Sequence, residues 1–166
     1  MKIWRLIGLR KVKVYLDTSV ISHLHQEDVP EKMEQTRKVW EILKSGKYDI
    51  VISDLVLAEI NECKEPKKSL LKEYLSLINY EKLEITSESE EIAKEIINEG
   101  ILNPKSFDDC LHIASAILSD CNVILSWNFK HMVNLDTING IRRITFAKRY
   151  NSIDIYAPYV LLNEKE

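Results

Sequence analysis

The sequence predicts an α/β fold, a three-layer α/β/α sandwich with a central, mostly parallel sheet. Two observations lead to this prediction. Apolar segments of strand length alternate with amphipathic segments of helical period, which is typical of parallel βαβ units. In addition, residues 122–126 (NVILS) are almost continuously apolar, as expected for a strand with both faces covered.

The expected elements follow one another without a linker or an internal repeat. In the first half of the chain, residues 12–16 (VKVYL) and 48–53 (YDIVIS) predict strands. A helix is expected at residues 33–44, where apolar side chains form one stripe. Further helices are expected at residues 54–62, directly after the second strand, and at residues 70–78, where leucines recur at helical spacing.

The second half continues this alternation. A short strand is expected at residues 83–86, and a helix around residues 92–97, where two apolar pairs stand four residues apart. Residues 107–119 form the next predicted helix, which precedes the strand at residues 122–126. A last strand is expected near residues 143–146.

Length and composition indicate a single globular domain. The 166 residues are 45% hydrophobic and 30% charged, as in ordinary globular proteins. The four glycines stand far apart, which excludes a phosphate-binding loop and a dinucleotide-binding fingerprint. The domain is expected at residues 12–162, after a basic N-terminal extension at residues 1–11.

Charge is unevenly distributed along the chain. The formal net charge is −3, yet residues 1–13 contain five basic residues and no acid. The acidic remainder is unlike a general nucleic-acid binder, but carboxylates that bind a metal ion are compatible with it.

Cysteine spacing and hydropathy bear on the compartment. The three cysteines form no CxxC pair and stand in apolar surroundings, which indicates free thiols in a reducing compartment. No apolar run reaches the length of a membrane span, and the N-terminus lacks the features of a secretory signal. A cytoplasmic protein that does not bind membranes is therefore expected.

Polar residues follow the predicted strands where each strand ends. Asp17, Asp54 and Asn128 come after the strands at residues 12–16, 48–53 and 122–126. Ligands of open parallel sheets bind outside the carboxyl ends of the strands, so these side chains can share one site. The alternative is helix capping, because Asp is a preferred N-cap residue. Capping is the favoured interpretation for Asp54, and both interpretations stay open for Asp17.

Two further carboxylates lie on predicted helices. Glu59 stands on an apolar stripe, where burying its charge is costly unless a cation compensates it. Asp109 shares a helix face with apolar Ile113 and is expected to face the sheet, whereas Asp108 is expected to face outward. Ser106 stands three residues before Asp109, so a capping box is the structural alternative.

Three isolated carboxylates, Asp17, Glu59 and Asp109, suit a hard divalent cation. Mg²⁺ and Mn²⁺ prefer oxygen ligands and are held by a few carboxylates with retained waters. Such an ion can activate water and neutralise a phosphate, as phosphodiester hydrolysis requires.

Four segments, VYLDTSVIS, ISDLVLAEI, DDCLHIASAI and ILSWNFKHMVN, resemble in that order the signature segments of PIN-domain ribonucleases. The resemblance covers about residues 12–160. It implies a PIN-like α/β/α fold and RNA cleavage with Mg²⁺ or Mn²⁺, with Asp17, Glu59 and Asp109 as the first three acids. Asn128 stands where many relatives carry a fourth acid, and Ser19 is a candidate supporting hydroxyl.

The resemblance also implies partners. Many small PIN proteins are the toxin of a toxin–antitoxin pair, are dimeric, and are inhibited by an antitoxin protein. An RNA substrate, an antitoxin partner and a homodimer are expected on that basis.

Two other interpretations remain open. Loss of the fourth acid at Asn128 is compatible with a PIN-fold binding module that has weakened catalysis. A phosphoacceptor receiver domain is the second, because Asp54 ends a strand in an α/β chain.

Overall fold

A computed structural model describes residues 10–163, so most of the predicted basic extension lies outside the described residues. Five strands form one sheet in which every pairing is parallel, in the order β3-β2-β1-β4-β5. The strands are β1 (Lys13–Leu16), β2 (Asp49–Ser53), β3 (Tyr80–Leu83), β4 (Val123–Leu125) and β5 (Asp154–Tyr156). The predicted fold class is confirmed.

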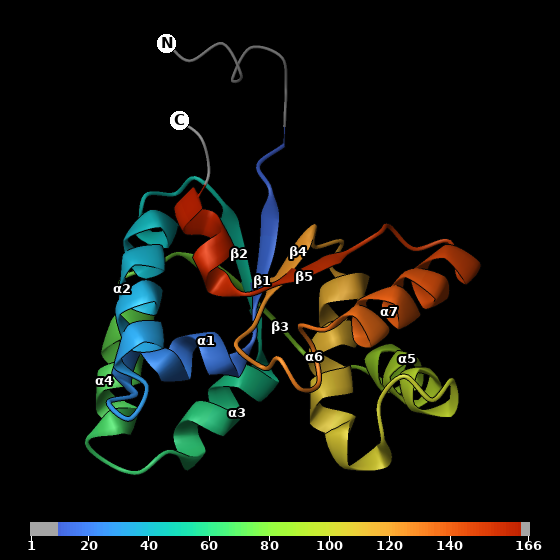
Figure 1. Cartoon of the computed structure of the whole chain (residues 1–166), viewed down its shortest axis with the longest axis horizontal. Coiled ribbons are helices and arrows are strands. Elements are labelled where there is room, and N and C mark those ends of the chain that lie inside the picture. The colour runs from blue at the N-terminus through green and yellow to red at the C-terminus, as the bar shows by residue number, and fades with distance from the viewer. Residues whose placement is uncertain (1–9, 164–166) are drawn as a thin grey trace.

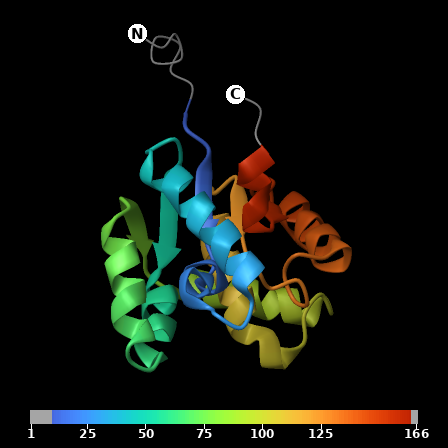
Figure 2. The ribbon, with the colours of Figure 1, turned by 60° about the vertical axis from the view of Figure 1, so that its left-hand side comes forward.

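Helices cover both faces of this sheet (Figures 1 and 2). One layer contains α1 (Thr18–Ser22), α2 (Pro30–Lys44), α3 (Asp54–Glu62) and α4 (Lys67–Ser76). The other contains α5 (Ser87–Asn98), α6 (Phe107–Leu118) and α7 (Leu135–Ala147). Short 3₁₀ helices complete the described chain: η2 (His23–His25), η3 (Pro104–Ser106) and η4 (Pro158–Asn163). The apolar side chains of β1, together with Ile124 and Leu125 of β4, are buried at the centre, as expected for parallel strands covered on both faces.

Two strand predictions need correction. The strand expected near residues 143–146 is wrong, because these residues belong to α7. Ile141, Ile144 and Thr145 are buried there at helical spacing, but the apolar positions are few, so the segment alone does not display the helical period. The last strand is β5 instead. The strand expected at residues 83–86 lies three residues earlier in the structure, where β3 spans Tyr80–Leu83.

The chain order of the strands creates a switch point between β1 and β4. The chain leaves β1 toward β2 on one side, while β4 pairs with β1 on the other. Leu16 lies opposite Leu125, and the Asp17 amide donates to the Leu125 carbonyl at 3.1 Å. Residues that follow β1 and β4 therefore meet at the carboxyl ends of the strands, where open α/β sheets bind ligands.

All three cysteines are free, and burial raises the pKa of the Cys110 thiol to about 12 and that of Cys121 to about 11. Within residues 10–163, no helix is both long enough and apolar enough to span a bilayer.

Candidate metal centre

Asp17 is the most buried carboxylate at the switch point, with only 4% of its surface exposed. Its Oδ2 accepts hydrogen bonds from the Ser19 hydroxyl at 2.6 Å and from the Ser126 hydroxyl at 2.7 Å. Asp17 precedes α1, yet its side chain makes no capping hydrogen bond. Of the two interpretations left open for Asp17, capping is therefore wrong.

Glu59 reaches the same end of the sheet through His112. The Glu59 Oε1 lies 2.8 Å from His112 Nε2, and Asp17 Oδ1 lies 3.7 Å from the same nitrogen. On the other side of the ring, His112 Nδ1 is 2.8 Å from the Tyr15 hydroxyl, which is 2.7 Å from the Ser53 hydroxyl. A buried chain of hydrogen bonds thus runs from β2 through β1 and α6 to Glu59.

Asp109 is half-buried and lies close enough to Asp17 for the two charges to interact, whereas Asp108 is exposed. The side-chain Nδ2 of Asn128 donates to Asp109 Oδ1 at 3.1 Å, and His131 Nδ1 lies 2.8 Å from Asp109 Oδ2. Ser106 precedes α6 without making a side-chain capping hydrogen bond. The capping-box alternative is therefore wrong.

The charges of the cluster act on one another. Burial raises the pKa of Asp109, and the negative charge of Asp17 adds to that rise, although His131 opposes it. Burial of His112 alone would lower its pKa, but the carboxylates of Glu59, Asp17 and Asp109 outweigh burial and raise the pKa of His112. The imidazole therefore offsets part of the carboxylate repulsion.

The metal-free protein should lose stability as the pH rises from about 6.5, the ordinary pKa of histidine. A folded-state pKa raised above the unfolded value stabilises the fold at low pH, and that contribution disappears as the pH rises through the folded pKa of His112. Urea unfolding in EDTA, repeated at increasing pH from about 6.5, measures this loss as a fall in the free energy of unfolding. His23, whose pKa is lowered by burial, contributes the opposite slope below about pH 6.5, and comparison with His112→Gln isolates the contribution of His112 above that pH. An identical pH dependence in wild type and His112→Gln would contradict this expectation.

Sequence reasoning missed the residues that hold the carboxylates: His112, His131, Tyr15 and Ser126. His112 stands four residues after the exposed Asp108, yet it is 2% exposed because α6 is packed between the sheet and α5. A usable signal was present, since His112 stands three residues after Asp109 and such residues are neighbours on a helix.

Asp54 does not join this cluster. It lies inside the first turn of α3, and its carboxylate accepts the amide N–H of Ile85 at 3.2 Å, tying the start of α3 to the segment after β3. The favoured prediction that Asp54 caps the helix is wrong. Because the carboxylate has this structural role, the receiver-domain interpretation has no support from Asp54.

The donor atoms at this site fit a hard cation. Among residues 10–163, only histidines pair with Asp17, Glu59 and Asp109, so no lysine or arginine neutralises them. Within the same residues, no three His, Cys, Asp or Glu side chains already stand close enough to ligate one ion together. Mg²⁺ retains several waters and needs only one or two direct carboxylates, so this spacing is compatible with it.

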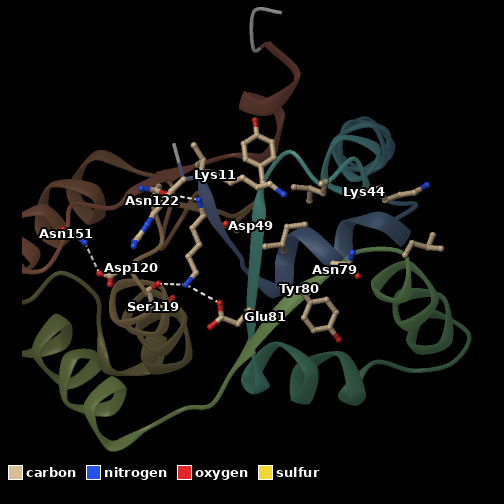
Figure 3. A pocket seen from close by; sticks show the side chains of 18 residues that line it. Lys11, Lys44, Asp49, Asn79, Tyr80, Glu81, Ser119, Asp120, Asn122 and Asn151 are labelled. Atoms are coloured by element: carbon tan, nitrogen blue, oxygen red, sulfur yellow. Dashed lines mark hydrogen bonds and ion pairs between the residues drawn. The ribbon is translucent and has the colours of Figure 1, made fainter. Parts of the chain in front are cut away.

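A cavity of about 1000 Å³ lies at the opposite, amino end of the strands (Figure 3). The Lys13 ammonium crosses it, donating to the Ser119 carbonyl at 2.7 Å and pairing with Glu81 at 3.3 Å. Arg10 and Lys11, the described end of the basic extension, also line this cavity. The extension therefore joins the domain at the end of the sheet that is remote from the carboxylates.

Comparisons with known proteins agree with this architecture. The sequence pattern of the PIN domain matches residues 14–130. No curated protein matches the chain. Among solved structures, the chain is similar to one described as VapBC2 from Rickettsia felis bound to a DNA fragment from their promoter, with a TM-score of 0.55 and 18% identity over 88% of this chain and 98% of that one. At that identity the likeness concerns the fold. The sequence match spans most of the chain and includes Asp17, Glu59 and Asp109, so the protein belongs to the PIN-domain family.

Proposed function

We propose that this protein is a divalent-metal-dependent endoribonuclease that hydrolyses RNA phosphodiester bonds with Mg²⁺ or Mn²⁺. The main support is the position of Asp17, Glu59 and Asp109 at the carboxyl end of the sheet, around His112. PIN domains are generally nucleases. Asp17, Glu59 and Asp109 stand where the resemblance to PIN-domain ribonucleases implies the first three acids.

The surrounding side chains would keep the carboxylates oriented for a metal ion. Two hydroxyls fix Asp17 Oδ2, His112 holds Glu59, and Asn128 and His131 hold Asp109. When bound, a divalent ion would acidify a coordinated water and offset the negative charge of the phosphate. Because the carboxylates are positioned before substrate arrives, little reorganisation is needed during the reaction.

We also propose that the protein is the toxin of a toxin–antitoxin pair and acts in the cytoplasm. The support is the fold shared with the VapBC2 structure, which is described as a complex on promoter DNA. Inhibition by an antitoxin protein follows from this role. The homodimer remains a prediction, which analytical ultracentrifugation of the purified chain can check.

Metal removal tests the nuclease proposal directly. Cleavage of a single-stranded RNA should stop in excess EDTA and return when Mn²⁺ or Mg²⁺ is added beyond the chelator. Among residues 10–163 no lysine or arginine pairs with the three carboxylates, so without a metal ion their charge repels the phosphate. Adding NaCl at equal ionic strength is the control and should restore nothing. Cleavage that continues unchanged in excess EDTA would refute the proposal. Absence of cleavage with either metal would favour the binding-module interpretation.

A further inference from the structure

An aromatic patch of Trp127, Phe129 and Tyr159 lies beside the carboxylates. The centroid of the Trp127 ring is 6.2 Å from that of Phe129 and 5.9 Å from that of Tyr159. Trp127 itself is buried, and its indole N–H donates to the Thr36 hydroxyl at 2.9 Å. Phe129 and Tyr159 are each 41% exposed, so the patch presents two accessible rings on a fixed base.

The patch is continuous with the candidate metal centre through the backbone. Asn128, which donates to Asp109, stands between Trp127 and Phe129 in the chain. The Trp127 amide donates to the Ser19 hydroxyl at 2.9 Å, and the same hydroxyl donates to Asp17. A polymer that places one phosphate at the carboxylates can therefore place a neighbouring unit against the exposed rings.

Lys32 adds a positive charge to this surface. Its ammonium lies 5.3 Å from the centroid of the Trp127 ring and 5.0 Å from that of Phe129. Among residues 10–163, no carboxylate forms an ion pair with Lys32, whereas Lys38 on the same helix, α2, pairs with Glu34 at 2.7 Å. Lys32 is therefore a cation available for an anionic ligand beside an aromatic surface.

We propose that Phe129, Tyr159 and Lys32 form a nucleotide subsite for single-stranded RNA, in which one base stacks on Phe129 and Lys32 contacts a flanking phosphate. This inference rests on the proposed function, because it assigns a binding position to the nucleotide next to the bond that is cleaved. Stacking on aromatic side chains tolerates every base, since each has a π-face. Lys32 supplies a positive charge that can neutralise a phosphate of the RNA backbone. A purely apolar protein interface would not need such a charge.

Binding of a labelled single-stranded RNA, followed by fluorescence anisotropy, tests the subsite. It is measured in EDTA and again in Ca²⁺, which takes oxygen ligands as Mg²⁺ does, with RNA integrity checked on gels. Phe129→Ala should weaken binding about tenfold, and Phe129→Tyr should retain it. The matched control is Phe146→Ala on α7, because Phe146 is 88% exposed and lies outside the patch.

Two further measurements sharpen the test. Lys32→Ala should reduce the slope of log affinity against log salt by about 0.7, the value for one phosphate contact on a single strand, while Lys38→Ala should change it less. An RNA carrying abasic positions should bind wild type more weakly than intact RNA, but the two RNAs should bind Phe129→Ala alike. Equal affinities of Phe129→Ala and Phe146→Ala would overturn the subsite and favour a protein partner on this surface.

These results separate the subsite from the nuclease proposal. If wild type binds RNA through Phe129 but cleaves none with Mn²⁺, the subsite stands and the nuclease proposal fails. If wild type cleaves RNA and Phe129→Ala has unchanged affinity and KM, the nuclease proposal stands and the subsite fails.

Discussion

Replacing Asp109 by Asn should reduce RNA cleavage about 100-fold or more, whereas replacing Asp108 by Asn should leave most activity. Asp109→Asn removes one negative charge from a site whose carboxylates offset the charge of a divalent metal ion. A loss of several kcal/mol of charge stabilisation in the transition state lowers the cleavage rate by at least about two powers of ten. The amide keeps the shape of the carboxylate and can still meet Asn128 and His131. The loss should therefore come from charge and not from misfolding.

Asp108→Asn is the matched control for this change, because it removes the same charge one residue away on an exposed side chain. Its expected cost is about 1 kcal/mol or less of folding stability, the size of a charge effect in the first turn of a helix. Cleavage rates on one RNA and Mn²⁺ affinities by calorimetry compare the two variants. Equal loss of activity in both would show that the local charge, and not the position of Asp109, determines catalysis.

The fold could be predicted where strands and helices have long, regular patterns. The apolar run of β4 and the stripe of α2 gave elements that the structure confirms, with small shifts at their ends. Prediction failed for α7 and β5. The buried positions of α7 stand between charged residues in a segment of modest hydropathy, and β5 has only three residues. Such elements are fixed by packing against the rest of the domain, which a single sequence does not display.

The candidate site could be predicted as a set of acids but not as a network. Charge on an apolar stripe is a strong local signal, and it identified Glu59 and the orientation of Asp109. Tyr15 and Ser53 gave no signal, because each reads as part of a buried strand until β1 and β2 are paired. His112 links residues that are 53 and 97 positions away in sequence, and only the tertiary fold brings them together.

Replacing Asn128 by Asp should tighten Mn²⁺ binding about tenfold or more and destabilise the metal-free protein. The change is nearly isosteric and restores an acid where many PIN relatives are expected to carry one. Asn128 now donates to Asp109 Oδ1 at 3.1 Å, so a carboxylate there would replace a hydrogen bond with charge repulsion. A bound dication relieves that repulsion, and ligand charge is a main determinant of affinity for hard cations.

Asn134→Asp is the matched control, because it adds the same charge in the same loop. The Asn134 Oδ1 accepts the Thr137 backbone N–H at the start of α7, a role that Asp fulfils equally well. Its Nδ2 also donates to the Phe129 and Lys130 carbonyls, so Asn134→Asp should lower metal-free stability as well, but without tightening Mn²⁺ binding. Calorimetry with Mn²⁺ and urea unfolding in EDTA should distinguish the two variants, with only Asn128→Asp combining tighter metal binding and lower metal-free stability. If Asn128→Asp leaves Mn²⁺ affinity at the wild-type value, the Asn128 side chain positions Asp109 without belonging to the metal site. In that case the protein would bind its metal with three acids alone.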